Sequence, residues 1–163
     1  MTVLSKMTEI WKDIDGFPRY KVSNLGRVKS YCKKEEKILT PRPKHGYKTI
    51  VLAGREKSIH RLMLKAFIPN PNPDIFTICD HINRNSMDNR LENLRWSTTQ
   101  LNNLNRTCRG YYYDKRDNKF IASLNINGKS KYLGSFKYSI HARQCYLAAK
   151  KIYLNKIDKY HDY

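Results

Sequence analysis

The stretch that decides the fold is residues 79–103, CDHINRNSMDNRLENLRWSTTQLNN, within a chain of 163 residues. Asp80 and His81 stand side by side near its start, and six asparagines follow them. Asparagine is a poor residue for the interior of a helix or a strand. The stretch is therefore either a capped surface loop or a site whose chemistry needs a carboxylate, an imidazole and carboxamides.

Short strands flank a loop in this stretch. Residues 75–79, IFTIC, form an apolar run with strand character, and residues 94–97, LRWS, form a second run of this kind. Residues 82–93 have neither the helical nor the strand period, which indicates a loop. Asp80 and His81 thus come at the end of the first strand, where a bend would be needed to turn both side chains toward one ligand.

A short helix is expected after the second strand. Thr98 or Thr99 can cap it, and it should run through Leu101 and Leu104 as far as Arg106. On such a helix Asn102 and Arg106 share a face because they are four residues apart. The predicted order is strand, long loop, strand, helix.

Positive charge is concentrated on both sides of this region. The formal net charge is +18, from 32 Lys and Arg against 14 Asp and Glu. Residues 1–70 carry +10, residues 71–107 carry no net charge and residues 108–163 carry +8. This excess of positive charge favours a polyanionic partner. The distribution indicates that the two basic flanks bind phosphate and that the neutral central region has a different function.

Several classes of protein are excluded by composition. No apolar run approaches the length of a membrane span, and no N-terminal pattern is typical of a signal peptide. We therefore expect a soluble protein that is not secreted and has no membrane partner. The four cysteines form no C-x-x-C pair, so no structural zinc is expected.

The basic N-terminal flank has the pattern of antiparallel β structure. Residues 20–23 and 27–31 alternate around a glycine turn, and residues 49–52 and 57–60 repeat the scheme. A helix should follow over residues 61–67, and the NPNP connector after it cannot continue a helix. His60 precedes this apolar helix with no acid beside it. It is either a ligand or base, or, as is more typical of such a position, a packed and hydrogen-bonded histidine.

The sequence pattern of the C-terminal flank predicts three strands and a helix. The strands are residues 111–115, 119–126 and 131–136, with turns at 116–118 and 127–129. The helix should run over residues 139–153, with Ala142, Cys145, Ala148, Ala149 and Ile152 at helical spacing.

The order of motifs resembles the HNH nucleases of the phage and intron-borne homing type. The central stretch is similar to the family in D-H-I, in the spaced asparagines and in N-L-R-W-S-T. In this match His81, Asn93 and Asn102 stand at the three positions that give the motif its name. The stretch from Glu9 to Ser30 is similar to the module that often precedes the nuclease in that family. The IHRL…AFIPNP stretch resembles the lead-in to the nuclease core.

The resemblance implies roles for individual residues. His81 would be the general base, and Asn93 would accept the ring N–H of His81. Asp80 and Asn102 would hold a divalent cation, Mg²⁺ or Mn²⁺, for which oxygen ligands are appropriate. Arg106 and Arg95 are candidates to bind the scissile phosphate. Asn83, Asn85, Asn89 and Asn103 are expected only to cap the loop.

The C-terminal flank resembles the three-stranded DNA-binding domain of plant ethylene-response factors, which implies contact with double-stranded DNA. It departs from that pattern at Phe120, where the family usually has Trp, and at the start of the helix, which leaves the target contacts open. The candidate DNA-binding residues of both flanks are Arg27, Lys29, Arg109, Lys115, Arg116, Lys119, Lys129 and Lys131.

The resulting expectation is an α+β protein in three parts. Residues 1–48 form a small N-terminal antiparallel β module, residues 49–107 a ββα-metal nuclease core, and residues 108–163 a three-stranded antiparallel sheet packed on one helix. The function expected is that of a metal-dependent, sequence-recognising DNA endonuclease that acts as a monomer on an asymmetric site. We expect it in the cytoplasm, which is that of the host cell if the protein is phage-encoded. The alternative is a DNA-binding regulator that retains the fold without catalysis, and RNA cleavage is a weaker third hypothesis.

Overall fold

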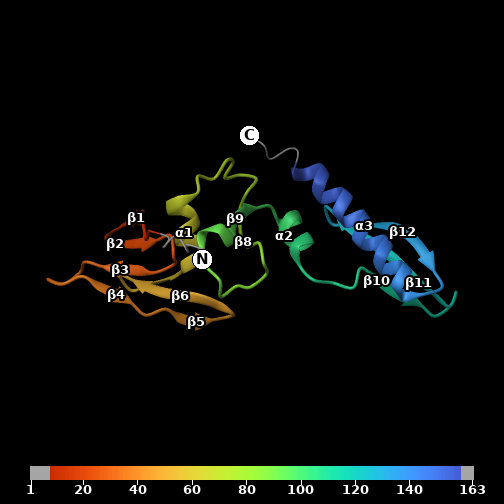
Figure 1. Cartoon of the computed structure of the whole chain (residues 1–163), viewed down its shortest axis with the longest axis horizontal. Coiled ribbons are helices and arrows are strands. Elements are labelled where there is room, and N and C mark those ends of the chain that lie inside the picture. The colour runs from red at the N-terminus through yellow and green to blue at the C-terminus, as the bar shows by residue number, and fades with distance from the viewer. Residues whose placement is uncertain (1–7, 159–163) are drawn as a thin grey trace, which may run out of the picture. The chain divides into compact units, whose positions relative to one another are not determined.

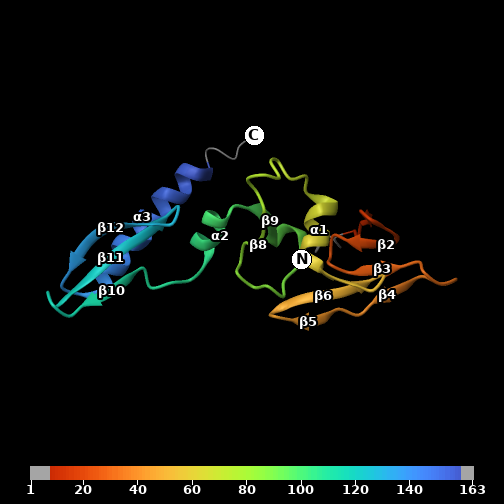
Figure 2. The same ribbon diagram turned by 180° about the vertical axis from the view of Figure 1, so that it is seen from behind.

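The chain divides into two compact units, residues 1–99 and residues 100–163. The structure, a computed structural model, describes residues 8–158 of this chain (Figures 1 and 2). Both units combine small antiparallel sheets with a helix. The α+β class predicted from the sequence is therefore confirmed.

Over its described residues, 8–99, the first unit contains three small antiparallel sheets and one α-helix. Its first sheet has the order β1-β2-β3-β4, its second β5-β6-β7 and its third β8-β9. The elements are β1 (Trp11–Ile14), β2 (Phe17–Ser23), β3 (Val28–Ser30), β4 (Lys37–Leu39), β5 (Arg42–Lys44), β6 (Tyr47–Leu52), β7 (Arg55–Ser58), α1 (Ile59–Phe67), β8 (Ile78–His81), the 3₁₀ helix η1 (Leu91–Asn93) and β9 (Leu94–Ser97).

One apolar core joins these sheets. Its buried members come from the first two sheets, from α1 and from β9, and they include Val22, Leu52, Met63 and Leu94. Helix α1 starts two residues earlier than expected, and the backbone N–H of Ile68 closes it by donating to the Leu64 carbonyl. Because the core is shared, the N-terminal β module and the lead-in to residues 78–97 support one another. The expected division after residue 48 falls inside β6.

The first strand of the β8–β9 hairpin begins later along the chain than the apolar run at residues 75–79 suggested. The register pairs Ile78 with Ser97 and His81 with Leu94. The amides of residues 75 and 76 instead donate to the Asn72 carbonyl in a turn, which removes them from the strand. The strand thus begins at Ile78 and includes Asp80 and His81, so the pairing continues through both residues.

The second unit is a three-stranded antiparallel sheet packed against a helix, as predicted. Its elements are α2 (Thr99–Asn105), which begins at the last residue of the first unit, β10 (Tyr111–Asp114), β11 (Lys119–Ile126), β12 (Lys129–Phe136) and α3 (Ser139–Asp158). Asn127 and Gly128 both have positive φ, +50° and +78°, as a two-residue turn of type I′ requires. In Figures 1 and 2, α3 lies along one face of this sheet.

The buried face of α3 differs in part from the expected one. Ala142 is buried as predicted, but Ala148 and Ile152 are exposed. The helix instead packs Tyr146, Ala149 and Tyr153 toward the core that contains Leu104 and Leu124. Positions 142, 146, 149 and 153 repeat at intervals of three and four, so the stripe is helical but is rotated relative to the one we expected.

Gly110 allows the most demanding contact in the second unit. Its φ is +76°, and a Cβ atom there would lie 2.0–2.4 Å from ring atoms of Tyr146. Tyr146 is held in place because its hydroxyl bonds the Cys108 thiol at 2.9 Å. The ring cannot withdraw without losing that bond and exposing the core.

We expect Gly110→Ala to destabilise the second unit strongly. Gly128→Ala is a matched control, because Gly128 has a similar φ of +78° and a Cβ atom there would have no described neighbour within 4 Å. Both variants carry the positive-φ cost of roughly 1 kcal/mol, but only Gly110→Ala overpacks the core, at about 2 kcal/mol more. Hydrogen exchange of the β11 amides measures the difference, and equal losses in the two variants would contradict the role of the Tyr146 contact.

Candidate active site

Asp80 and His81 are held at the end of β8 by the pairing with β9. Both residues are buried, with 5% and 6% of their surface exposed. Asp80 lies opposite Arg95 in the register, and His81 lies opposite Leu94. Successive side chains of a strand point to opposite faces, and the two residues accordingly have different partners: Arg95 for Asp80 and Asn89 for His81.

Arg95 neutralises the carboxylate of Asp80. Its Nε donates to Asp80 Oδ2 at 3.0 Å, and its Nη2 lies 2.9 Å from the same oxygen. The Asp80 side chain is only 6% exposed, whereas that of Arg95 is 39% exposed. A buried carboxylate needs such a partner, because an unpaired charge would be costly to remove from water. Arg95, expected to bind phosphate, is in this structure engaged with Asp80.

The imidazole of His81 contacts a different asparagine from the one expected. Its Nε2 lies 2.9 Å from Oδ1 of Asn89, and both residues are buried. Asn93, which we expected to accept the ring N–H, has other partners. The orientation of His81 by Asn93 stays a prediction, whereas the assignment of Asn89 to loop capping alone is wrong.

Asn93 instead closes the base of the loop. Its Oδ1 accepts the backbone N–H of Asn83 at 2.9 Å, and its Nδ2 donates to the Asp88 carbonyl at 2.7 Å. Its own carbonyl accepts the N–H of Ile82 at 2.9 Å. One carboxamide at the end of η1, just before β9, thus satisfies a backbone donor and a backbone acceptor of the loop, which explains the physical need for an asparagine at position 93.

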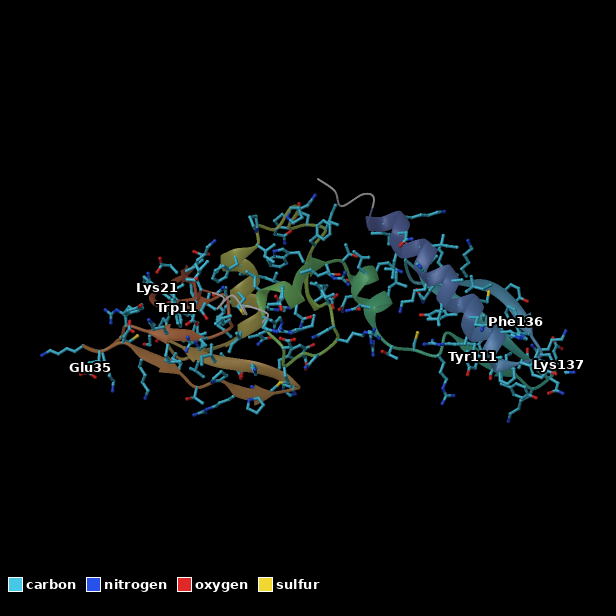
Figure 3. All side chains as sticks on the ribbon, viewed as in Figure 1. Trp11, Lys21, Glu35, Tyr111, Phe136 and Lys137 are labelled. Carbon is cyan, nitrogen blue, oxygen red and sulfur yellow. The ribbon has the colours of Figure 1, made fainter. Side chains whose placement is uncertain are left out.

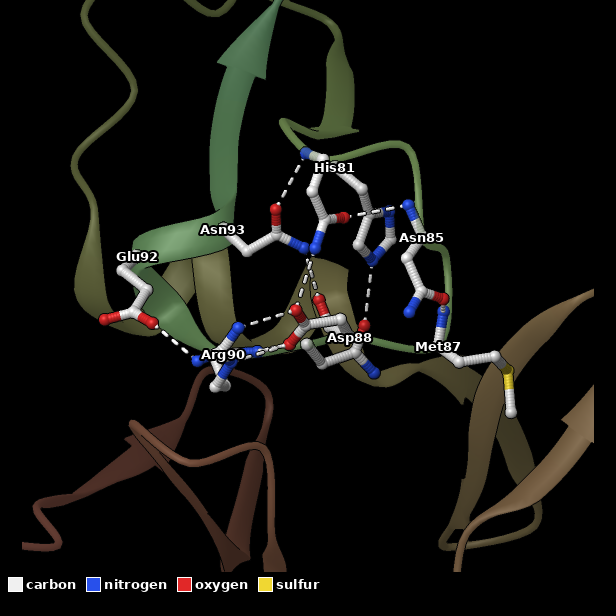
Figure 4. A network of polar contacts seen from close by, with 9 residues as sticks. His81, Asn85, Met87, Asp88, Arg90, Glu92 and Asn93 are labelled. Atoms are coloured by element: carbon white, nitrogen blue, oxygen red, sulfur yellow. Dashed lines mark hydrogen bonds and ion pairs between the residues drawn. The ribbon is translucent and has the colours of Figure 1, made fainter.

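A polar network gives the loop its shape (Figure 4). Arg90 binds Asp88 through two hydrogen bonds of 2.9 and 3.0 Å, and Asn83 Nδ2 donates to Asp88 Oδ2 at 2.9 Å. The hydrogen bonds from Arg90 hold the pKa of Asp88 well below its usual range. The backbone N–H of Met87 donates to Asn85 Oδ1 at 3.1 Å, and Arg84 adopts a positive φ of +66°. Side chains, and not a regular ladder, therefore satisfy much of this backbone.

Two aromatic rings pack beside His81. The ring centroid of His60, on α1, lies 5.1 Å from that of His81, and the Tyr47 ring lies 5.0 Å from His60 and 6.1 Å from His81. His60 is 5% exposed, and its Nδ1 is buried without a hydrogen-bond partner. His60 is therefore packed, as expected, and the hydrogen bond expected of it is absent at Nδ1.

Burial of His60 predicts a pH-dependent stability of the first unit. Burial, and to a lesser extent the nearby His81 and Arg61, lower its pKa to about 4. In the unfolded chain the pKa is near 6.5, so acid protonates the unfolded state first. The free energy of unfolding should therefore be undiminished above pH ~6.5 and fall by up to about 3 kcal/mol as the pH drops to ~4.

Urea titrations of the protein and of His60→Phe at several pH values measure this effect. The Phe variant keeps a ring of similar size and removes the titration, so the contributions of other groups cancel in the comparison. We expect the variant to lose less stability on acidification than the unmodified protein. Parallel pH profiles would contradict the assignment to His60.

The remaining candidates of the central stretch lie on or beyond α2. Asn102 is on α2 and is partly buried. Helix α2 ends at Asn105, so Arg106 follows the helix and does not share a helical face with Asn102 as expected. The structure describes Asp80 and Asn102 in separate units, and their joint binding of one metal ion stays a prediction.

Family comparisons agree with this geometry. Residues 9–53 match the NUMOD4 motif, and residues 57–104 match the HNH endonuclease family. The second match contains the hairpin of β8 and β9, the loop and α2. Residues 57–104 of this chain are thus similar to the HNH endonuclease family. The recognition made from the order of the motifs is confirmed.

Similar proteins carry the same family description. Two uncharacterized HNH endonucleases of Acanthamoeba polyphaga mimivirus are 41% identical over 106 residues and 30% identical over 135 residues. The matches cover 61% and 80% of this chain but only 26% and 38% of those relatives. A solved structure describing DNA binding and cleavage by the HNH homing endonuclease I-HmuI is 28% identical, with a TM-score of 0.51 and 76% of each chain covered.

The basic residues that we assigned to DNA lie differently in the two flanks of the HNH region. Arg27 is ion-paired with Glu9, and Lys29 is ion-paired with Glu36 at 2.9 Å with its side chain only 15% exposed. Lys29 Nζ also lies 4.5 Å from the ring centroid of Trp11, which Figure 3 labels. The C-terminal candidates are all exposed: Arg109, Lys115, Arg116, Lys119, Lys129 and Lys131.

Two further structural facts bear on the site. Within residues 8–158, no three His, Cys, Asp or Glu side chains gather as a metal-binding group. Over the same described residues, no helix is long and apolar enough to cross a membrane.

Asn89, Tyr47 and His60 lie beside His81 in ways that the sequence pattern did not predict. Asn89 lies eight positions after His81 in a loop without a period, so no spacing rule connects the two. Tyr47 and His60 come from β6 and α1 and meet His81 only through tertiary packing. The one available signal was a histidine within the apolar start of a helix, at position 60.

Proposed function

We propose that this protein is a metal-dependent DNA endonuclease of the HNH homing type that hydrolyses a phosphodiester bond. One observation carries the proposal: a buried carboxylate and a buried imidazole, Asp80 and His81, are adjacent on a strand of the HNH region, and each is held by a partner of suitable chemistry. The family match and the likeness to I-HmuI support a nuclease in general.

His81 is the proposed general base. Phosphodiester hydrolysis needs a group that takes a proton from the attacking water, and a neutral imidazole does so near neutral pH. The hydrogen bond to Asn89 and the packing against His60 restrict the ring to one orientation. Asn93 acts by holding the loop on which Asn89 stands, through its bonds to Asn83 and Asp88.

Asp80 and Asn102 would hold the divalent cation. The test of fit is the chemistry of the donors: both offer oxygen, which hard cations such as Mg²⁺ and Mn²⁺ prefer, and Mg²⁺ commonly takes only one or two protein ligands. Both Arg95 contacts reach Oδ2 of Asp80, which orients the carboxylate as partners of ligating residues usually do. When bound, the cation stabilises charge on the phosphoryl oxygens and on the leaving oxygen.

Double-stranded DNA is the proposed substrate. The net charge of +18 and the exposed lysines and arginines of the second unit support binding to phosphate. The second unit is proposed to contact DNA, in line with its resemblance to the ethylene-response-factor domain. Arg95 and Arg106 remain candidates for the scissile phosphate, and the two unlike flanks favour a monomer on an asymmetric site.

A plasmid-nicking assay tests the proposal. Supercoiled DNA should be converted to nicked or linear product when Mg²⁺ or Mn²⁺ is present, and addition of EDTA should stop the reaction. Binding without cleavage, with either metal and over a range of DNA sequences, would instead support the alternative of a DNA-binding regulator. Cleavage of RNA but not DNA would overturn the substrate assignment.

A further inference from the structure

We propose that Asn89 is the positioning residue that fixes the tautomer of His81, so that Nε2 carries the ring proton and Nδ1 accepts the proton in the reaction. The inference rests on the proposed role of His81 as general base. It adds which ring nitrogen accepts the proton. Asn89 is outside the three positions that name the family motif.

The contact itself is the first support. Asn89 Oδ1 lies 2.9 Å from His81 Nε2, and both side chains are buried. A carboxamide oxygen only accepts hydrogen bonds, so a ring facing it must donate. A neutral imidazole has one N–H, and with that proton on Nε2 the lone pair is on Nδ1. The tautomer of a catalytic histidine is commonly set through its other nitrogen in this way.

The amide nitrogen of Asn89 bears on why a carboxamide stands at this position. Asn89 Nδ2 is buried without a hydrogen-bond partner. Leaving a buried donor unsatisfied is unfavourable, and an apolar side chain at this position would avoid it. The contact between Asn89 and His81 is therefore the only described interaction of this side chain that accounts for a carboxamide at position 89.

Packing restricts the ring further. His60 and Tyr47 lie beside His81, with centroid distances of 5.1 and 6.1 Å. His60 is buried, and its low pKa keeps it neutral, so it adds no positive charge next to the base. A ring flip of His81 would exchange Nδ1 with Cδ2 and Nε2 with Cε1, and it would need movement of these neighbours.

NMR of the full-length protein, free of DNA and metal, tests the assignment directly. At mildly alkaline pH the ring ¹³C and ¹⁵N shifts of His81 should report the Nε2–H tautomer. Asn89→Asp keeps the acceptor and should preserve this tautomer, whereas Asn89→Leu is of similar size but has no acceptor and should give a mixture. Asn155→Leu is the control, because Asn155 is an exposed asparagine on α3, outside the loop and the proposed site.

Cleavage measurements complete the test. Under single-turnover conditions with saturating DNA, Asn89→Leu should cleave about tenfold or more slowly, with DNA affinity unchanged within a few-fold, and Asn89→Asp should recover much of the rate. An Nδ1–H tautomer in the unmodified protein, or an unchanged tautomer in Asn89→Leu, would overturn the inference even if a variant folds poorly. If the protein cleaves nothing but the tautomers are as stated, the proposed function fails and the positioning by Asn89 stands.

Discussion

His81→Ala should abolish most DNA cleavage while leaving DNA binding within a few-fold of the unmodified protein. Loss of a general base typically lowers the rate by about 10²–10⁴-fold, and His81 is 6% exposed and is not one of the residues proposed to bind phosphate. Single-turnover cleavage at saturating DNA measures the first quantity, and a binding titration without metal measures the second.

The matched control for this variant is His141→Ala. His141 is an exposed histidine on α3 that contacts Tyr138 and is outside the proposed site. The substitution at position 81 leaves Asn89 without its ring partner, so the melting temperature of each variant should be recorded. A parallel loss of binding and cleavage in His81→Ala, accompanied by unfolding, would assign His81 a structural role in place of a catalytic one.

Asp80→Asn should remove nearly all metal-dependent cleavage, and Mn²⁺ should not restore the full rate. The variant keeps the shape of the side chain but replaces the charged ligand, and amide oxygens bind hard cations more weakly than carboxylates. It also removes a negative charge near the expected path of the DNA phosphates, so DNA affinity in the absence of metal should stay equal or rise. Manganese binding, followed by its paramagnetic effect on water, should weaken in parallel.

A carboxylate elsewhere in the first unit provides the control. Asp13 is ion-paired with Lys21 at 3.4 Å, and its side chain is 73% exposed. Asp13→Asn makes the same change of charge outside the proposed site and should leave cleavage and manganese binding unchanged. Full activity of Asp80→Asn with Mn²⁺ would mean that Asp80 is not a ligand.

Local patterns in the sequence were sufficient for the architecture of the second unit. The turn at Asn127 and Gly128 follows from two residues that tolerate positive φ. The alternation of residues 119–126 predicts the strand β11, and the spacing of apolar residues after residue 139 predicts α3. The same patterns did not predict which stripe of α3 is buried. That stripe includes Tyr146 because its ring packs directly against Gly110, and this contact depends on the tertiary structure.

The sequence by itself also determined the resemblance to HNH endonucleases, since the ordered motifs of residues 9–106 are specific without any contact information. The sequence also placed Asp80 and His81 at the end of one strand, because the end of a strand is predicted from residues that are neighbours in the chain. Only the tertiary structure decided that Asn89 contacts His81, that Asn93 closes the loop and that His60 packs behind the imidazole. Such contacts depend on how an irregular loop folds, and a loop without a period gives its side chains no direction that a spacing rule can predict.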